Sequence, residues 1–152
     1  MTTYSEYTEA EKQAQLFIAN PFYEKMNWII NRDGANYIYD LILKKDDVEY
    51  KIEEKFRFKD YHDFLIELIQ DVPTYEKGWY YSSGSKFIFY WVCDGIDKLY
   101  VVNWDKFKIW INDNWGNVKI DWGISIEGRG KTLFACIKWD IVPNELYKLY
   151  KE

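Results

Sequence analysis

The chain has 152 residues, of which 48% are hydrophobic, 20% aromatic and 30% charged. This composition supplies enough apolar area for a sizeable core and excludes a disordered linker or tail, and the length suits a single domain over residues 1–152. Lysine and arginine together number 20 against 25 aspartates and glutamates, a formal net charge of −5, which excludes a protein that coats nucleic acid through phosphate contacts alone.

The sequence also bears on location and on the two cysteines. No apolar run reaches the roughly 18 to 20 residues that a membrane span needs, and the first residues lack the basic start and apolar stretch of a signal peptide. We therefore expect a soluble, cytoplasmic protein with no membrane association. Cys93 and Cys136 lack the spacing and the histidine neighbours of a zinc site, so we expect two reduced, buried thiols.

The chain is expected to open with a helix. Thr8 and Glu11 have the spacing of a capping box, and apolar residues recur at helical intervals until Asn20-Pro21 interrupts them. The stretch 22–30 is apolar but ambiguous, and we interpret it as a second short helix that runs into a strand.

A β-hairpin and another helix are expected next. The runs 36–43 and 48–58 are rich in strand-forming residues and flank Asp46-Asp47, which predicts a two-residue turn. The stretch 61–70 has apolar residues on one helical face and is preceded by Asp60, a good cap residue. We therefore expect a helix directly after the hairpin.

The second half of the chain reads mainly as strands. The almost unbroken apolar run 86–93 predicts a strand covered on both faces, and a turn leads from it to a second strand at 99–103. The stretch 104–112 suits a helix or a strand. The remaining expected elements are a hairpin with strands at 118–126 and 132–141 around a turn at 127–130, and a short terminal helix after Pro143.

The predicted hairpin brings charged side chains together. A two-residue turn places Asp40 opposite Glu53, with Lys55 two residues along on the same face. The opposite face collects the side chains that we expect in the core: Tyr37, Tyr39, Leu41, Leu43, Tyr50, Ile52 and Phe56.

Two carboxylates and one amine are suited to phosphodiester hydrolysis. Carboxylate oxygens bind Mg²⁺ or Mn²⁺, which can hold a scissile phosphate and lower the pKa of a bound water. A neighbouring lysine can orient or deprotonate the attacking water, or neutralise the negative charge of the transition state. Asp40, Glu53 and Lys55 are therefore the candidate catalytic residues.

Asp40, twelve intervening residues and then Glu53-Glu54-Lys55, on a hairpin between two predicted helices, resemble the signature of the PD-(D/E)xK nucleases, also called restriction-endonuclease-like. The resemblance covers roughly residues 8–105. It implies an α/β fold with a restriction-endonuclease-like mixed central sheet and flanking helices. It also implies a small bacterial or phage-type nuclease that uses Mg²⁺ or Mn²⁺ and acts on nucleic acid, most plainly DNA.

The resemblance further assigns roles to residues. Asp40 and Glu53 would bind the metal and Lys55 would serve the water. A glutamate of the first helix often joins such a site, and Glu11 is preferred here over Glu24.

Three further side chains are candidates for contact with the substrate. Arg57 and Lys59 could contact flanking phosphates, and Gln70 is similar to a polar residue that some members direct at the substrate or the lysine. Proteins with related folds often form dimers, and the high aromatic content of this chain would allow a homodimer.

The sequence also departs from the signature. The residue between the acid and the lysine is usually apolar because it points into the core, but here it is Glu54, which needs a partner or an altered register. The competing frame Glu49-Tyr50-Lys51 has an apolar middle residue, yet only eight residues separate it from Asp40 and it lies near the turn. We retain the Glu53 frame.

A second interpretation stays open at this point. Charges at every second position from 49 to 57 are typical of the solvated face of a strand, and Asp40 could form a structural ion pair with Lys55. Against this, Asp40 lies within an apolar run, where an unpaired carboxylate is costly.

The alternative function is a catalytically inactive, acidic interaction protein on the same scaffold, such as a phage-encoded inhibitor of a host nucleic-acid-binding factor.

Overall fold

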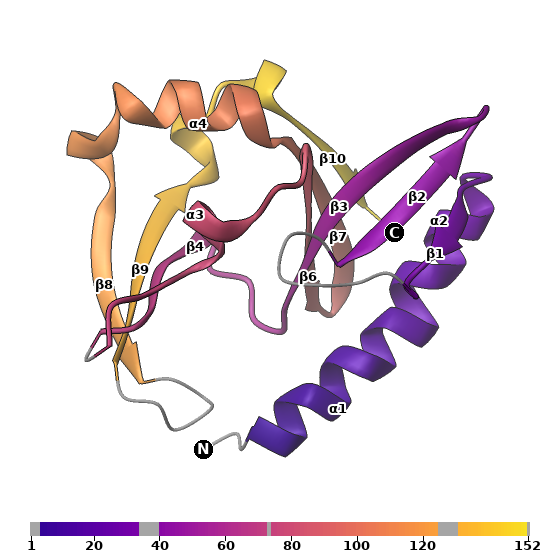
Figure 1. The fold of residues 1–152 in the computed structure, drawn as a ribbon, viewed down its shortest axis with the longest axis horizontal. Helices are drawn as coiled ribbons and strands as arrows, with labels where there is room; N and C mark the ends of the chain where they lie inside the picture. Colours follow the sequence, from indigo (N-terminus) through magenta and orange to yellow (C-terminus); the bar gives the residue numbers. More distant parts are fainter. Residues whose placement is uncertain (1–3, 34–39, 73, 125–130, 152) are drawn as a thin grey trace.

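The computed structural model describes residues 4–33, 40–72, 74–124 and 131–151, and it confirms the prediction of a mixed α/β fold (Figure 1). A mixed sheet of six strands, the large sheet, contains in spatial order β1 (Ile29–Asn31), β2 (Leu41–Lys45), β3 (Val48–Arg57), β6 (Phe87–Asp94), β7 (Ile96–Asn103) and β10 (Tyr147–Lys151). An antiparallel sheet of four strands, the small sheet, contains β5 (Glu76–Lys77), β4 (Asp63–Asp71), β9 (Lys131–Lys138) and β8 (Lys119–Ile124).

Helices and helical turns complete the architecture. They are α1 (Tyr4–Ala14), the π-helical turn η1 (Gln15–Ala19), α2 (Asn20–Lys25), α3 (Trp79–Ser82), α4 (Trp104–Asn112) and the 3₁₀ turns η2 (Trp115–Asn117), η3 (Trp139–Ile141) and η4 (Asn144–Leu146). Among the residues that the structure describes, no helix combines the length and the apolarity needed to cross a bilayer.

The N-terminal helix differs from its prediction at both ends. It is already helical at Tyr4 and continues through Thr8, so the expected capping box does not mark its start. Asn20-Pro21 does not end it either, because η1 accommodates the missing N–H and Pro21 lies in the first turn of α2. A helix running into a strand at 22–30 is confirmed by α2 and β1.

The predicted hairpin and its register are confirmed. Leu41 pairs with Ile52 and Leu43 with Tyr50. Asp46 and Asp47 have φ values of 52° and 63°, as a tight turn with both central residues in the left-handed region requires. The core side chains Leu41, Leu43 and Ile52 are fully buried, whereas Tyr37 and Tyr39 lie outside the described residues.

The helix predicted over 61–70 is wrong, because this stretch forms β4 and pairs antiparallel with β9. Phe64, Ile66 and Leu68 are all buried, so the same apolar residues that suggested a helical face also follow the period of two of a strand. Pairing with a distant strand overrides the local helical pattern. Asp60 accepts the N–H of His62 at 2.8 Å and closes a turn instead of capping a helix.

The second half largely follows the prediction. β6 lies centrally in the large sheet, parallel to β3 and antiparallel to β7, and both of its faces are buried. The ambiguous stretch 104–112 is the helix α4, capped by the side chain of Asn103, which accepts the N–H of Lys106 at 3.2 Å. The terminal helix is wrong: a single 3₁₀ turn follows Pro143, and β10 then pairs with the otherwise unpaired edge of β7.

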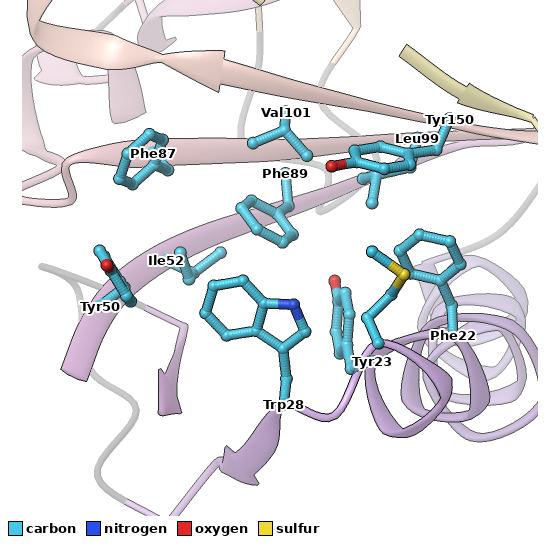
Figure 2. Close-up of a pocket in the computed structure, with 11 residues that line it drawn as sticks. Phe22, Tyr23, Trp28, Tyr50, Ile52, Phe87, Phe89, Leu99, Val101 and Tyr150 are labelled. Atoms are coloured by element: carbon cyan, nitrogen blue, oxygen red, sulfur yellow. The ribbon is translucent and has the colours of Figure 1, made fainter. Parts of the chain in front are cut away.

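Two apolar cores lie on opposite faces of the large sheet. On one face, buried residues of β6 and β7 pack against the small sheet, α3 and α4, with Tyr100 stacked on Trp139 at 3.9 Å between ring centroids. On the other face, η1 and α2 cover the sheet, and Tyr23 meets Phe89 edge-on at 5.7 Å (Figure 2). The alternating side chains of β3 therefore point into two different environments.

Candidate active site

The site begins with Asp40, immediately before β2. Its N–H donates to the carbonyl of Ile52 at 2.9 Å, which extends the hairpin pairing by one residue. Its Oδ2 accepts the N–H of Glu54 at 2.7 Å. These two bonds hold the carboxylate of Asp40 against the strand segment that carries Glu53 and Lys55.

Glu53 and Lys55 lie on the face of β3 that points toward the small sheet. Nζ of Lys55 is 3.1 Å from Oε1 of Glu53, and the exposed fraction of the Glu53 side chain is only 7%. Ser83 Oγ approaches the other oxygen, Oε2, at 3.4 Å. The ammonium of Lys55 also stands 5.4 Å from the ring centroid of Trp79, so α3 and the residue after it cover the ion pair.

The position of α3 depends on Gly78. A Cβ at this residue would lie 2.3 Å from the carbonyl oxygen of Glu67 in β4, which is far inside van der Waals contact. The N–H of Gly78 donates to the carbonyl of Leu68 at 2.9 Å. The absence of a side chain at Gly78 thus lets α3 pack directly on β4 and brings Trp79 over Lys55.

The pKa values of Glu53 and Lys55 follow from burial and from the charged side chains around them. Burial raises the pKa of Glu53, the charge of Asp40 raises it further, and Lys55 and Ser83 act in the opposite sense. Burial alone would lower the pKa of Lys55, but the carboxylates of Glu53, Asp40 and Glu67 together raise it. Lys55 is therefore a stable cation at neutral pH, suited to neutralising charge and not to accepting a proton.

Glu11 of α1 lies within electrostatic reach of this group. Burial raises its pKa most, Lys55 lowers it and Asp40 raises it, so its carboxylate senses both site charges. Glu24, the less preferred candidate, is exposed on α2. The first helix thus directs a carboxylate toward the hairpin from Glu11, the residue preferred on sequence grounds.

A divalent ion at this site would need oxygen ligands from nearby side chains. Within the described ranges, no three His, Cys, Asp or Glu side chains stand close enough together to hold a metal ion by themselves. Mg²⁺ commonly binds through one or two carboxylates and keeps several water ligands. Asp40 and Glu53 offer two such carboxylates, one from the residue before β2 and one from β3, and the charge of Asp40 raises the pKa of Glu53.

The unusual Glu54 has the partner that its position demands. Its side chain is 1% exposed, and Oε1 receives Nη1 of Arg32 at 2.7 Å. The hydroxyl of Tyr23 donates to Oε2 at 2.6 Å and accepts Nε1 of Trp91 at 2.9 Å. Arg32 also donates to Asn20. The register with Glu54 facing the α2 side is thus compatible with a buried carboxylate.

The competing frame lies on a more open part of the hairpin. Glu49 and Lys51 are both exposed, whereas Glu53 is buried. Tyr50 between them packs on the core behind the sheet. The buried, multiply contacted carboxylate therefore belongs to the Glu53 frame.

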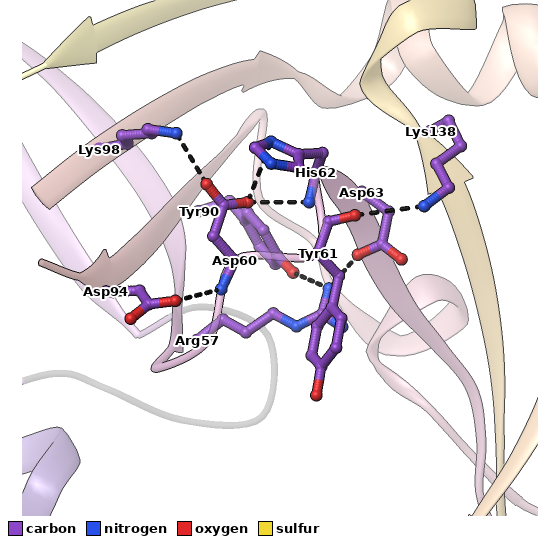
Figure 3. Close-up of polar contacts among 9 residues, drawn as sticks. All are labelled: Arg57, Asp60, Tyr61, His62, Asp63, Tyr90, Asp94, Lys98 and Lys138. Atoms are coloured by element: carbon purple, nitrogen blue, oxygen red, sulfur yellow. Dashed lines mark hydrogen bonds and ion pairs between the residues drawn. The ribbon is translucent and has the colours of Figure 1, made fainter. Parts of the chain in front are cut away.

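The proposed substrate contacts differ in how their side chains are held. Arg57 pairs with Asp63, donates to the hydroxyl of Tyr90 at 3.2 Å and stands 4.7 Å from the ring centroid of Tyr61 (Figure 3). Lys59 is exposed, with its ammonium 5.3 Å from the same ring. Arg57 is thus occupied within the protein, while Lys59 remains accessible at the surface.

Gln70 lies near the end of β4 and not on a helix. Its carbonyl accepts the hydroxyl of Thr132 at 2.9 Å, which ties this end of the strand to the small sheet. This contact places the backbone of Gln70 in the small sheet, and contact of its side chain with the substrate or the lysine stays a prediction.

Sequence reasoning missed two sets of residues. The sequence does not identify Arg32 and Tyr23, although the unusual Glu54 indicates that some partner is required. Ser83 and Trp79 approach Glu53 and Lys55 through α3, and nothing in the local sequence signals those contacts. Comparison of the chain with protein-family models, with curated proteins and with solved structures found no match in any of the three.

Proposed function

We propose that this chain is a metal-dependent nuclease of the PD-(D/E)xK type that hydrolyses phosphodiester bonds of DNA in the cytoplasm. The observation that carries the proposal is the hydrogen bond from the N–H of Glu54 to Oδ2 of Asp40. This bond holds the aspartate at the strand segment from which Glu53 and Lys55 project. Two carboxylates and a cation thereby lie within electrostatic reach of one another.

Each residue has a role in this proposal. Asp40 and Glu53 would hold Mg²⁺ or Mn²⁺, and Glu11, whose pKa responds to the charges of Asp40 and Lys55, is the candidate for a third carboxylate. The ion, when bound, supplies polarisation of the phosphate and activation of a water. Lys55 stays protonated and neutralises negative charge that develops on the phosphate. Lys59, at the open surface beyond β3, contacts a flanking phosphate.

The test is cleavage by the purified full chain. We expect DNA to be nicked or degraded with Mg²⁺ or Mn²⁺ and to stay intact with EDTA. Lys55→Gln should slow cleavage by roughly 10²- to 10³-fold, the usual loss when one electrostatic contact to a transition state is removed. Lys51→Gln is the matched control, since it removes the same charge from the same face of β3 and should leave the rate unchanged. A larger effect of Lys51→Gln would mean that the register is wrong.

The inactive interaction protein is a second candidate, and the ion pair of Glu53 and Lys55 favours it. At 3.1 Å the two side chains neutralise each other without any ion, as in a structural pair. The strand β4, in place of the helix that the resemblance implied, also weakens the likeness to a nuclease. A panel of double-stranded, branched and single-stranded DNA and of RNA that stays uncut with both metals would favour this candidate.

A further inference from the structure

A pocket of about 240 Å³ lies on the face of the large sheet opposite Glu53 and Lys55 (Figure 2). One wall is formed by Phe22 and Tyr23 of α2 and by Trp28, which precedes β1. The other wall is the sheet itself, where β3, β6, β7 and β10 each contribute side chains. The pocket exists because η1 and α2 cover only part of this face.

The walls are built mainly from aromatic rings at steep angles to one another. Tyr50 stands 5.6 Å from Trp28 and 5.9 Å from Phe87, both at 70° between ring planes. Phe22 meets Tyr150 at 5.5 Å and 69°. All eleven lining residues belong to the described part of the chain and none carries a formal charge. Such a pocket has few hydrogen-bonding groups for water, and its aromatic surface suits a flat apolar group.

The size of the pocket limits its occupant. An apolar cavity of about 150 Å³ is large enough to take benzene. At about 240 Å³ this pocket has room for one or two fused aromatic rings. A ring inserted here would meet the edges and faces of Trp28, Tyr50 and Phe87, the arrangement that aromatic groups prefer.

Two lysines stand at the rim. Lys148 pairs with Val101 across β10 and β7, so its side chain leaves the sheet on the pocket face, and its ammonium lies 4.9 Å from the ring centroid of Tyr150. Lys45 lies 5.7 Å from the ring centroid of Trp28 and donates to the carbonyl of Met26 at 3.2 Å. An uncharged aromatic pocket thus has a cation beside each of two lining rings.

We propose that this pocket binds a small planar aromatic carboxylate of one or two rings. The rings lie between Trp28 and the sheet, and the carboxylate pairs with Lys148. Lys45, whose ammonium already has a partner, adds a weaker attraction. This binding site lies on the opposite face of β3 from Glu53 and Lys55 and does not depend on the proposed nuclease activity.

The test uses 2-naphthoate and its neutral analogue 2-naphthalenemethanol with the full chain, by calorimetry and by NMR of labelled protein. We expect naphthoate to bind more tightly than the alcohol and to shift the indole signal of Trp28. Lys148→Gln should weaken naphthoate binding by roughly two- to fivefold, the usual range for one exposed ion pair, and leave the alcohol unaffected. Lys151→Gln should change neither, because Lys151 pairs with Lys98 and lies on the opposite face of β10.

Filling the pocket gives a second arm. Val101→Phe places a ring in the pocket and should abolish binding of both probes. If Val101→Phe unfolds the chain, the smaller change Val101→Leu is measured in its place and should weaken the binding of both probes. The proposal is overturned if neither probe binds at millimolar concentration, if the acid and the alcohol bind equally, or if Lys151→Gln matches Lys148→Gln. It is also overturned if the protein is a dimer that Val101→Phe converts to a monomer, since a second copy would then occupy this face.

Discussion

Arg32 and Glu54 form an ion pair with 2.7 Å between Nη1 and Oε1, and the glutamate side chain is 1% exposed while the arginine is 24% exposed. Glu54 occupies the position between the two proposed catalytic residues on β3, but it points to the other side of the sheet. The pair therefore supports, from the opposite face of the sheet, the strand segment that carries Glu53 and Lys55. Removing the pair should lower the free energy of unfolding more than it changes the rate of the proposed cleavage.

Removing one partner of this pair should be costly. Arg32→Met leaves a buried carboxylate without its cation, and we expect the free energy of unfolding to fall by about 3 kcal/mol, the low end for a broken buried pair. Adding Glu54→Gln to that variant should restore most of the loss, because glutamine is neutral and can still accept from Tyr23. Urea denaturation of the three proteins checks this. A double variant no more stable than Arg32→Met would contradict the role of the pair.

Asp40→Asn separates a metal site from a structural ion pair. In a metal site Asp40 and Glu53 repel each other without metal, so the variant should be as stable as the parent or more stable in EDTA. Asparagine can still accept the N–H of Glu54, and Lys55 keeps Glu53 as its partner. The variant should also lose the rise in melting temperature that Mn²⁺ gives the parent.

Thermal melts of parent and variant, each with EDTA and with Mn²⁺, provide the measurement. If Asp40 instead serves as the structural partner of Lys55, neutralising it should cost roughly 3 to 5 kcal/mol. If the variant is strongly destabilised and Mn²⁺ does not change the melting temperature of the parent, the proposed catalytic role of Asp40 is wrong.

Glu53 should make stability depend on pH in an unusual direction. Burial and the charge of Asp40 raise its pKa in the folded state above the ordinary value of 4.5, so the folded protein binds this proton more readily than the unfolded chain. Its stabilising contribution is therefore present at low pH and is lost as the pH rises through the raised value. We expect the stability of the parent relative to Glu53→Gln to fall as the pH increases above about 4.5, by urea denaturation in EDTA.

Asp60 supplies the control of opposite sign. The hydrogen bond from Lys98 lowers its pKa below the ordinary 3.8, so its contribution is present at neutral pH and is lost as the pH falls through the lowered value. The stability of the parent relative to Asp60→Asn should therefore decrease on acidification. Equal pH slopes for the two variants would contradict the assignment of Glu53.

Gly78→Ala should displace α3, which carries Trp79 over Lys55. The new Cβ would lie 2.3 Å from the carbonyl oxygen of Glu67, and since backbone cannot move away cheaply, we expect a loss of about 1 to 3 kcal/mol. The same variant should weaken cleavage, because α3 carries Trp79 to Lys55. Gly116→Ala is the matched control: nothing lies within 4 Å of its Cβ, and its effect should stay within about 0.5 kcal/mol in urea denaturation.

The hairpin could be predicted because its determinants are local. A two-residue turn and an alternating pattern fix both the register and the faces, so Asp40, Glu53 and Lys55 could be grouped from sequence alone. The strand 63–71 could not be predicted in this way. Its apolar residues satisfy both periods, and the choice depends on pairing such as that of Phe64 with Ile137, which lies far along the chain.

The candidate site likewise contains some contacts that the local sequence predicts and others that depend on distant residues. The carboxylates and the lysine lie within one hairpin and follow from parity. Arg32 reaches Glu54 from the residue after β1, and Ser83 reaches Glu53 from the end of α3. Both contacts depend on how helices pack on the sheet, and no short-range pattern encodes that packing.

The parallel pairing of β3 with β6 has a consequence during synthesis. β3 ends at Arg57 and β6 begins at Phe87, so one edge of β3 has no partner until the ribosome has made the whole intervening segment. Exposed strand edges invite association with other nascent chains, and charged side chains on such an edge oppose it. The charges at every second position from Glu49 to Lys55 thus oppose aggregation of the hairpin until β6 has been made.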